Sequence, residues 1–240
     1  MPFTRPRHWL RWLLAAAGVV VVLGAAGPFV YIHFFNRAPA ALSLSPTGTP
    51  DSASGSAPTA SAAAAGPVAG TWTVGPGSIV GYRVNEVLLG QSATAVGRTT
   101  SVTGQLAIQG TTVITASFSV PMATVHSDKS QRDAQFDGRI MDVSQYPTGT
   151  FTLTSPIDLA PLPASGVIGD YTAHGNLTLH GTTRAVTVTL TAERKGAQIE
   201  VAGHIPVLFA DYNIQNPSFA GFVTTQDDGL LEFLLIFNRT

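Results

Sequence analysis

One segment of the sequence gathers charged side chains at a spacing that could recognise a polar group. It contains Asp128, Arg132, Asp133, Asp137 and Arg139. In a helix, residues four apart lie on the same face, so Asp128 and Arg132 would form an ion pair there. Two interpretations of Arg132 stay open. Its guanidinium clamps a phosphate or carbonyl head group, or it only fixes the helix to the rest of the fold by an ion pair.

The usual signatures of catalysis and metal binding are absent from the sequence. There is no G-x-S-x-G elbow, no phosphate-binding G-x-x-x-x-G-K-[ST] loop and no H-E-x-x-H pair. The absence of cysteine excludes disulfides, thiolate catalysis and thiolate metal sites. We therefore expect no catalytic residue, no metal site and no cofactor. The histidines after residue 70 are scattered and never paired at i, i+2 or i, i+4: His126, His174, His180 and His204.

The charge balance argues against nucleic acid as a partner. Residues 1–69 carry four arginines and one aspartate, a formal charge of +3, so residues 70–240 carry −4 of the total of −1. Affinity for nucleic acid comes largely from basic side chains that neutralise phosphates. An acidic region without a basic run is a poor binder of polyanions.

An apolar segment near the N-terminus predicts a single membrane span. Residues 12–35 contain no formal charge if His33 is neutral, and a helix of that length would measure about 36 Å against a hydrocarbon core of about 30 Å. Three arginines precede the segment and one follows it, which places residues 1–11 in the cytoplasm and the rest of the chain outside. The alternative is a cleaved signal peptide ending near Ala38-Pro39-Ala40, but the apolar run is longer than the roughly 7–15 residues typical of one.

The next segment is expected to be a flexible tether. Residues 36–69 are almost entirely Ala, Ser, Pro, Gly and Thr, and such a composition buries too little apolar surface to offset the entropy lost on ordering. The domain of residues 70–240 would then stay within a few nanometres of the bilayer.

Hydrophobic alternation after residue 70 predicts β-strands with one buried face. It recurs in residues 150–154, 176–180, 186–191 and 199–205, with glycines and prolines between the runs. In another run the apolar positions are Ile114, Ala116, Phe118 and Val120. Seven to nine antiparallel strands in about 170 residues indicate an all-β barrel or sandwich.

A segment without this alternation predicts one short helix. Residues 128–136 contain neither Gly nor Pro, and Asp128 with Gln131 three positions later has the pattern of a capping box. Such a helix either closes one end of a barrel or forms a plain connection.

The order of several motifs resembles a known family. The motifs, after an opening at Trp72, are Arg132-Asp133, Phe136-Asp137, Tyr146-Pro147, the run Leu177-Thr178-Leu179-His180-Gly181-Thr182-Thr183-Arg184, and Asp211-Tyr212-Asn213. Together they resemble the YceI-like family of exported, lipocalin-like barrels over essentially all of residues 71–238. Members are typically secreted with a cleavable signal, whereas this chain is expected to keep its anchor.

The resemblance implies an eight-stranded antiparallel barrel with an elongated apolar cavity for an isoprenoid lipid, either a quinone or a prenyl phosphate. The residues expected to line the cavity are Phe118, Phe136, Phe151, Leu177, Leu179, Phe209, Phe222 and Phe233. For the head group the candidates are Arg132, Arg184 and His180.

Two other functions stay open at this point. A small barrel either fills its interior with side chains or encloses a ligand, and periodicity does not separate these cases. A filled barrel would favour an extracytoplasmic interaction or envelope-stress protein. An enzyme acting on the lipid would need an acid or base inside the cavity, for which Asp133 and His126 are the candidates. The sequence does not specify an oligomeric state.

Overall fold

The strands of this chain form one continuous sheet in which each pair of neighbours is antiparallel. The computed structural model describes residues 38–44, 67–88, 90–218 and 223–240. The strands of this part of the chain are β1 (Gly70–Val74), β2 (Ile79–Leu88), β3 (Gln91–Thr99), β4 (Thr103–Gln109), β5 (Thr112–Pro121), β6 (His126–Ser127), β7 (Thr148–Leu153), β8 (Ile157–Asp158), β9 (Ile168–Leu179), β10 (Thr182–Lys195), β11 (Gln198–Leu208), β12 (Val223–Thr225) and β13 (Asp228–Arg239). Its helices and helical turns are η2 (Met122–Thr124), α2 (Ser130–Gln135), η3 (Phe136–Ile140) and η4 (Phe209–Tyr212).

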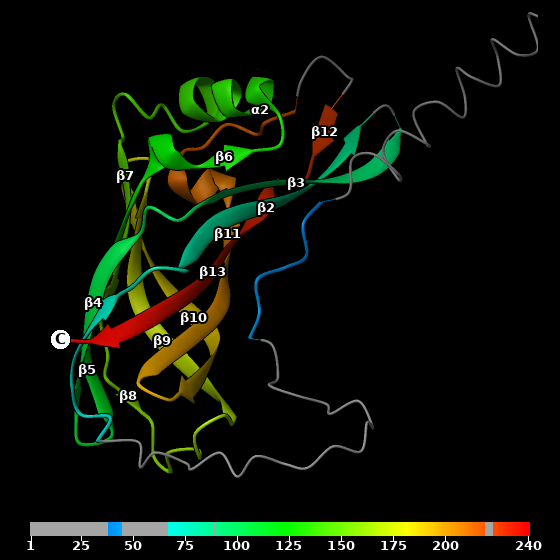
Figure 1. The fold of residues 1–240 in the computed structure, drawn as a ribbon. Coiled ribbons are helices and arrows are strands. Elements are labelled where there is room, and N and C mark those ends of the chain that lie inside the picture. Colours follow the sequence, from blue (N-terminus) through cyan, green and yellow to red (C-terminus); the bar gives the residue numbers. More distant parts are fainter. Residues whose placement is uncertain (1–37, 45–66, 89, 219–222) are drawn as a thin grey trace, which may run out of the picture.

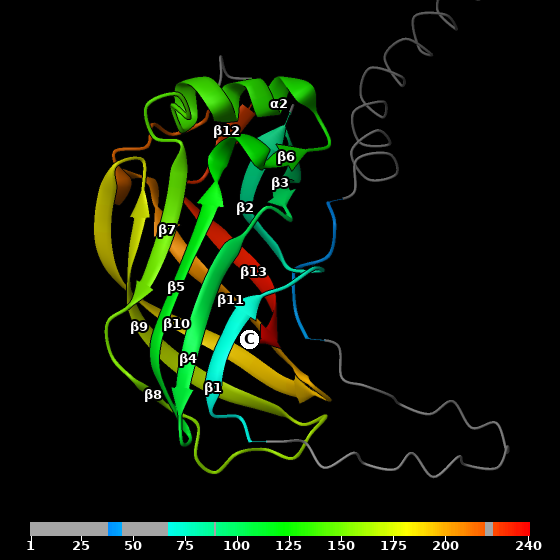
Figure 2. The ribbon, with the colours of Figure 1, turned by 60° about the vertical axis from the view of Figure 1, so that its left-hand side comes forward.

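Eight of the described strands close into a barrel. Their order is β1-β4-β5-β7-β9-β10-β11-β13, and the ring closes because β1 also pairs with β13. Figures 1 and 2 show the barrel from two sides, with α2 across one end. The predicted all-β, eight-stranded antiparallel barrel with one short helix is confirmed.

β13 pairs with β11 along one edge and closes the barrel by pairing with two strands in turn along the other. Leu230–Leu234 pairs with β2, whereas Phe237–Arg239 pairs with β1. Where the partner changes, the Gly75 amide donates to the Ile236 carbonyl at 2.7 Å and the buried Ser78 hydroxyl accepts from the Ile236 amide at 2.9 Å. The backbone groups of Ile236 therefore keep partners across the corner, as buried peptide groups require.

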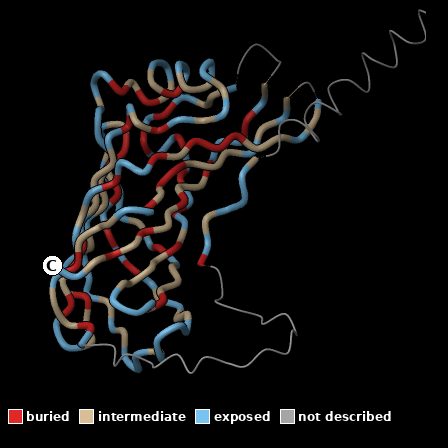
Figure 3. The backbone as a smooth tube through the Cα atoms, in the orientation of Figure 1, coloured by how far each residue is buried: buried red, intermediate tan, exposed pale blue. Residues whose placement is uncertain are grey.

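The inward-facing side chains form two apolar clusters that share members. One cluster lies toward α2 and includes Phe136 and Leu177, and the other lies toward the opposite end and includes Trp72 and Phe237. Phe233 packs against both clusters. Figure 3 shows buried and exposed residues along the same strands, as expected for a closed sheet with one face inside.

The alternation of buried and exposed residues predicted for β5 is wrong at Ile114. Ile114 was expected to share the buried face of the strand, but it is 44% exposed, whereas Val113 is 6% exposed. The register explains the difference, because Thr115 lies opposite Ala107 while Val113 lies opposite Ile108. Ile114 is thus the extra residue of a β-bulge, and a bulge reverses the face on which the preceding side chains lie.

The predicted helix is confirmed, but its predicted cap is wrong. The N-cap of α2 is Lys129, which makes no side-chain cap hydrogen bond. Asp128 instead accepts from Arg132 Nη1 at 2.5 Å, which is the predicted ion pair four residues apart. Asp133 reaches back to the entering strand, where its Oδ1 accepts from the Ser127 amide at 2.8 Å and from the Ser127 hydroxyl at 2.6 Å. α2 therefore begins one residue later than a cap at Asp128 requires.

The predicted membrane span, residues 12–35, and the predicted cytoplasmic tail, residues 1–11, lie outside the described residues. Within the described part of the chain, no helix has the length and apolarity needed to cross a bilayer. Residues 38–44, part of the segment expected to be a flexible tether, lie on the outside of the barrel, where the Arg83 guanidinium donates to the Pro39 carbonyl at 2.8 Å.

The bulge in β5 can be tested by a pair of alanine substitutions. Val113→Ala should lower the free energy of unfolding by about 1–3 kcal/mol, because it removes buried methyl groups from the core. Ile114→Ala should change it by no more than about 0.5 kcal/mol, although it removes more carbon atoms, because the side chain is largely exposed. Urea unfolding of both variants gives the comparison, and a larger loss for Ile114→Ala would contradict this register.

Candidate functional site

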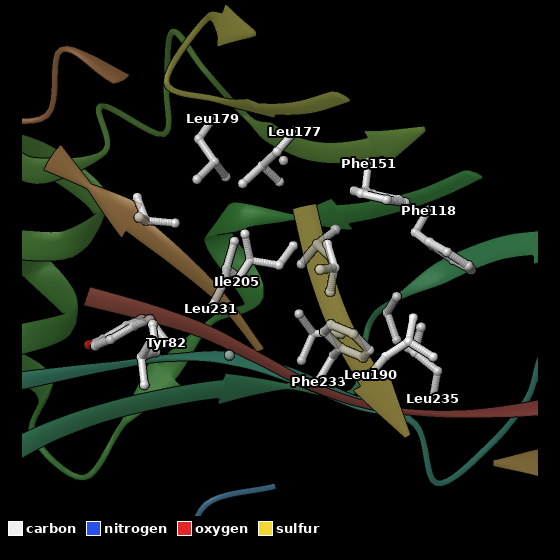
Figure 4. A pocket seen from close by; sticks show the side chains of 18 of the residues that line it. Tyr82, Phe118, Phe151, Leu177, Leu179, Leu190, Ile205, Leu231, Phe233 and Leu235 are labelled. Atoms are coloured by element: carbon white, nitrogen blue, oxygen red, sulfur yellow. The ribbon is translucent and has the colours of Figure 1, made fainter. Parts of the chain in front are cut away.

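The barrel encloses one large apolar cavity of about 860 Å³, found among the described residues. Its lining extends from Leu162 and Ile108, at the end away from α2, to Arg132 and Phe136 at the α2 end. Figure 4 shows apolar side chains that enter this space from strands on different sides of the barrel. The volume lies in the upper part of the roughly 300–1,000 Å³ range of ligand pockets.

The structure brings most of the predicted cavity residues together. Seven of them line the cavity: Phe118, Phe136, Phe151, Leu177, Leu179, Phe209 and Phe233. The eighth, Phe222, lies outside the described residues. Phe118, Phe151 and Leu177 come from β5, β7 and β9 and stand opposite one another in the register. Residues paired across neighbouring strands point to the same face, so these three form one row on the inner wall.

Aromatic rings in this wall lie over glycines of the adjacent strand. A Cβ atom on each of these glycines would come within 2.3–2.7 Å of a ring carbon. The pairs are Tyr82 on Gly97, Phe118 on Gly104, Phe151 on Gly175 and Phe233 on Gly203. The missing side chains let the rings rest against the backbone instead of projecting across the interior. The sequence does contain this signal, in the form of glycines inside otherwise regular strands.

Polar side chains gather at the α2 end of the cavity, whereas the rest of its wall is mostly apolar apart from Glu193 and Arg194, near the end of β10. Lys129, Gln131, Arg132, Gln135 and Arg139 all line this end. Cationic and amide groups are strong donors for carbonyl and phosphate oxygens. The cavity therefore offers a long, mostly apolar compartment with a group of hydrogen-bond donors at the α2 end.

Two residues of this polar end were not predicted from the sequence, Tyr82 and Glu86. The Tyr82 ring stacks on Phe136 with centroids 5.2 Å apart and planes at 15°. Burial raises the pKa of Tyr82 to about 12, and the nearby Arg132 charge opposes that shift. The phenol thus stays protonated at neutral pH and can donate a hydrogen bond. Glu86 lies 3.4 Å from Arg132 Nη2, which ties α2 to β2.

This architecture matches proteins whose structures are known. A family model of the YceI-like domain matches residues 72–237. The chain belongs to the YceI-like family.

Solved structures show the same fold as this YceI-like chain. A polyisoprenoid-binding domain from Saccharophagus degradans is 17% identical, with a TM-score of 0.59 over 70% of this chain and 98% of that one. Burkholderia cenocepacia BcnA is 21% identical, with a TM-score of 0.53 over 66% of this chain and 95% of that one. A mutant YceI protein of Campylobacter jejuni is 14% identical, with a TM-score of 0.50 over 60% of this chain and 84% of that one. No curated protein matches the chain.

The three head-group candidates of the YceI-like barrel are separated in space. Arg132 lines the cavity, but Arg184 and His180 do not belong to its lining. Arg184 Nε donates to the Asp211 carbonyl at 2.8 Å, and His180 Nδ1 lies 3.1 Å from the Tyr212 carbonyl oxygen. Arg184 has the strand parity of the cavity residue Val188, but near the start of β10 its exposed side chain binds η4 instead. Arg184 and His180 thus hold η4 against the β9–β10 hairpin.

The two residues considered for an enzyme also lie outside the cavity lining. His126 Nδ1 is 3.5 Å from Asp133 Oδ2, and the histidine side chain is 66% exposed. Asp133 is occupied with the Ser127 amide and hydroxyl. Both residues therefore organise the junction between β6 and α2. No group of three potential metal ligands occurs within the described residues.

The raised pKa of Tyr82 predicts a specific loss of stability in alkaline solution. The unfolded tyrosine has a pKa of about 10, so as the pH rises the unfolded chain releases its proton before the folded chain does. Stability is therefore lost between about pH 10 and about pH 12. In Tyr82→Phe this contribution disappears, so its free energy of unfolding should fall less between about pH 9 and about pH 11.5.

Urea unfolding at the two pH values measures this difference for the parent and Tyr82→Phe. Burial also raises the pKa of Tyr171 and Tyr212, and both remain in the variant and serve as an internal control. Equal losses of stability in the two proteins would contradict the buried, protonated phenol.

Proposed function

We propose that this chain is a membrane-tethered extracytoplasmic binding protein that holds an isoprenoid-tailed amphiphile, a quinone or a prenyl phosphate, in the barrel cavity. The observation that carries the proposal is the apolar cavity of about 860 Å³ in a YceI-like barrel. The similar domain from Saccharophagus degradans is a polyisoprenoid-binding domain, which supports the same ligand class here.

The apolar wall supplies enough free energy to retain such a tail. Each CH₂ group that leaves water contributes about 0.8 kcal/mol. Each prenyl unit has five carbon atoms, so a few units offset the entropy lost when the lipid and the protein associate. The tail would lie along the rows that Phe118, Phe151 and Phe233 contribute to. The cavity thus favours length and flexibility in the ligand rather than a particular shape.

The charges at the α2 end favour an uncharged head group, and of the two lipids we propose the quinone. Arg132 is already paired with Glu86 and Asp128, and Lys129 lies 3.6 Å from Asp128. With Arg139, these five groups carry a formal charge of only +1, too little to balance a doubly ionised phosphate. Quinone carbonyls need donors rather than net charge.

The cavity argues against a filled barrel, and it does not contain the residues considered for an enzyme. A filled barrel would have favoured an interaction or envelope-stress protein, whereas the interior of this barrel is hollow. The two residues considered as the acid or base of an enzyme, Asp133 and His126, lie outside the cavity lining; of the carboxylates that do line it, Glu86 is paired with Arg132.

The N-terminal sequence completes the proposed function. An uncleaved span at residues 12–35, with residues 1–11 in the cytoplasm, would keep the barrel beside the bilayer in which such lipids dissolve. The barrel could then exchange its ligand with the membrane without carrying it through bulk water.

A filled cavity should abolish lipid binding without unfolding the barrel. Ala173 is 3% exposed and lines the cavity from β9, so Ala173→Phe places a ring inside the lumen. Binding of a radiolabelled long-chain quinone, measured by co-elution on gel filtration, should weaken at least about tenfold, or about 1.4 kcal/mol.

Ala185→Phe is the matched control, because Ala185 is exposed on the outer face of β10, and it should bind like the parent. A prenyl phosphate of equal tail length should bind more weakly than the quinone. Unchanged binding by Ala173→Phe would refute the cavity as the site, and tighter binding of the phosphate would refute the preference for an uncharged head.

A further inference from the structure

A cluster of three charged residues lies on the outer wall of the barrel, away from the cavity. Glu232 is 3% exposed although it stands at an outward position of β13. Its carboxylate accepts from Arg83 Nε at 3.2 Å and from Arg98 Nη2 at 2.7 Å. One carboxylate shared by two guanidinium groups leaves several N–H donors unused within the cluster.

Those remaining donors bind the backbone of the segment that precedes the barrel. Arg83 Nη2 donates to the Pro39 carbonyl at 2.8 Å, and Arg98 Nη2 donates to the Ala40 carbonyl. The Leu42 amide in turn donates to Glu232 Oε2 at 3.4 Å. The cluster thus donates to two carbonyl groups of the segment and accepts from one of its amides. This set of contacts suits the backbone of an extended chain.

The side chains of the segment match this arrangement. Leu44 is 7% exposed and Leu42 is half-buried, while Ala41 and Ser43 are exposed. This alternation is typical of an extended chain that lies with one face on a surface. Leu42 and Leu44 are also the only leucines between residues 36 and 69, in a stretch otherwise made mostly of small and polar residues.

The barrel wall is shaped to bring the three charges together. Arg98 on β3, Gly81 on β2 and Glu232 on β13 stand in one register row. A Cβ atom on Gly81 would lie 2.8 Å from Arg98 Cγ and 2.1 Å from the Gly97 carbonyl oxygen. The absence of a side chain on β2 therefore lets Arg98 cross this strand and reach Glu232.

The contacts also give the direction of the segment. Pro39 is bound at Arg83, whereas Leu42 is bound at Glu232, which stands opposite Gly81. Moving from Arg83 to Gly81 along β2 leads away from Glu86, the residue that contacts α2. Figures 1 and 2 agree, with the segment, in blue, running down the outside of the barrel from the end that carries α2.

We propose that the Arg83–Glu232–Arg98 cluster is an intramolecular docking site for residues 38–44, which holds the α2 end of the barrel next to the chain that precedes residue 38. Together with the proposed membrane anchor, this docking turns the α2 end of the cavity toward the bilayer. The orientation rests on the proposed function, whereas the docking itself does not.

Spin labels on the full chain in phospholipid nanodiscs test the docking. The chain contains no cysteine, so Ser43→Cys and Ala185→Cys, both at exposed positions, place one label on the segment and one on the barrel. Double electron–electron resonance should give one narrow distance distribution. Leu44→Asp, which puts a charge at the buried position, should broaden it, whereas the matched control Ala41→Asp should leave it narrow. A broad distribution in the parent, or one that Leu44→Asp leaves narrow, would overturn the proposal.

The orientation of the barrel is measured separately, with a fluorophore attached at Ser130→Cys in α2 or at Ser155→Cys after β7. Nitroxide lipids should quench the first label more strongly in the parent, and Leu44→Asp should reduce the difference. Equal quenching in the parent would overturn the orientation. Quinone binding measured on the same samples separates the two proposals, since a docked segment without binding contradicts only the proposed function.

Discussion

The hollow interior of this barrel depends on aromatic rings that lie on glycines of the neighbouring strand. An eight-stranded barrel is just wide enough for its side chains to fill the lumen, and this one carries large apolar residues along its inner face. Because Gly203 has no side chain, the Phe233 ring occupies the space above it and stays on the wall. The same contact therefore stabilises the sheet by dispersion and keeps about 860 Å³ open for a ligand.

The two ends of the barrel differ, and the difference gives the cavity a direction. At one end α2 is tied to β2 by Arg132 and Glu86 and brings donors to the cavity. The other end is lined mainly by apolar residues such as Ile108 and Leu162, together with Arg194 and the buried Glu193. An amphiphile with its head at the α2 end would place its apolar tail along the mostly apolar wall that follows. The docked residues 38–44 approach from the α2 end, so the same end that would bind the head group would also face the anchor.

The sequence predicted the strands well because alternation reports burial directly, and the order of motifs predicted the barrel. It failed where a local event changed the geometry. Because of a bulge, Val113 faces the interior instead of Ile114. Asp128 forms ion pairs with Lys129 and Arg132 and does not cap the helix. Strand parity predicted that Phe118, Phe151 and Leu177 face inward, and the resemblance to the family predicted the cavity. The place of Arg184 was not predictable, because it depends on a long-range contact with η4. The docking of residues 38–44 has only a weak signal, two leucines in a polar segment, and its partners are distant in the chain.

Native mass spectrometry of the full chain, extracted from the membranes of its source cells together with its bound lipids, tests the central claim most directly. We predict the mass of the intact chain, with the N-terminal segment retained, and one isoprenoid quinone per protein that organic extraction releases. A chain without bound lipid, which also takes up neither quinone nor prenyl phosphate when these are added, would contradict the proposed function.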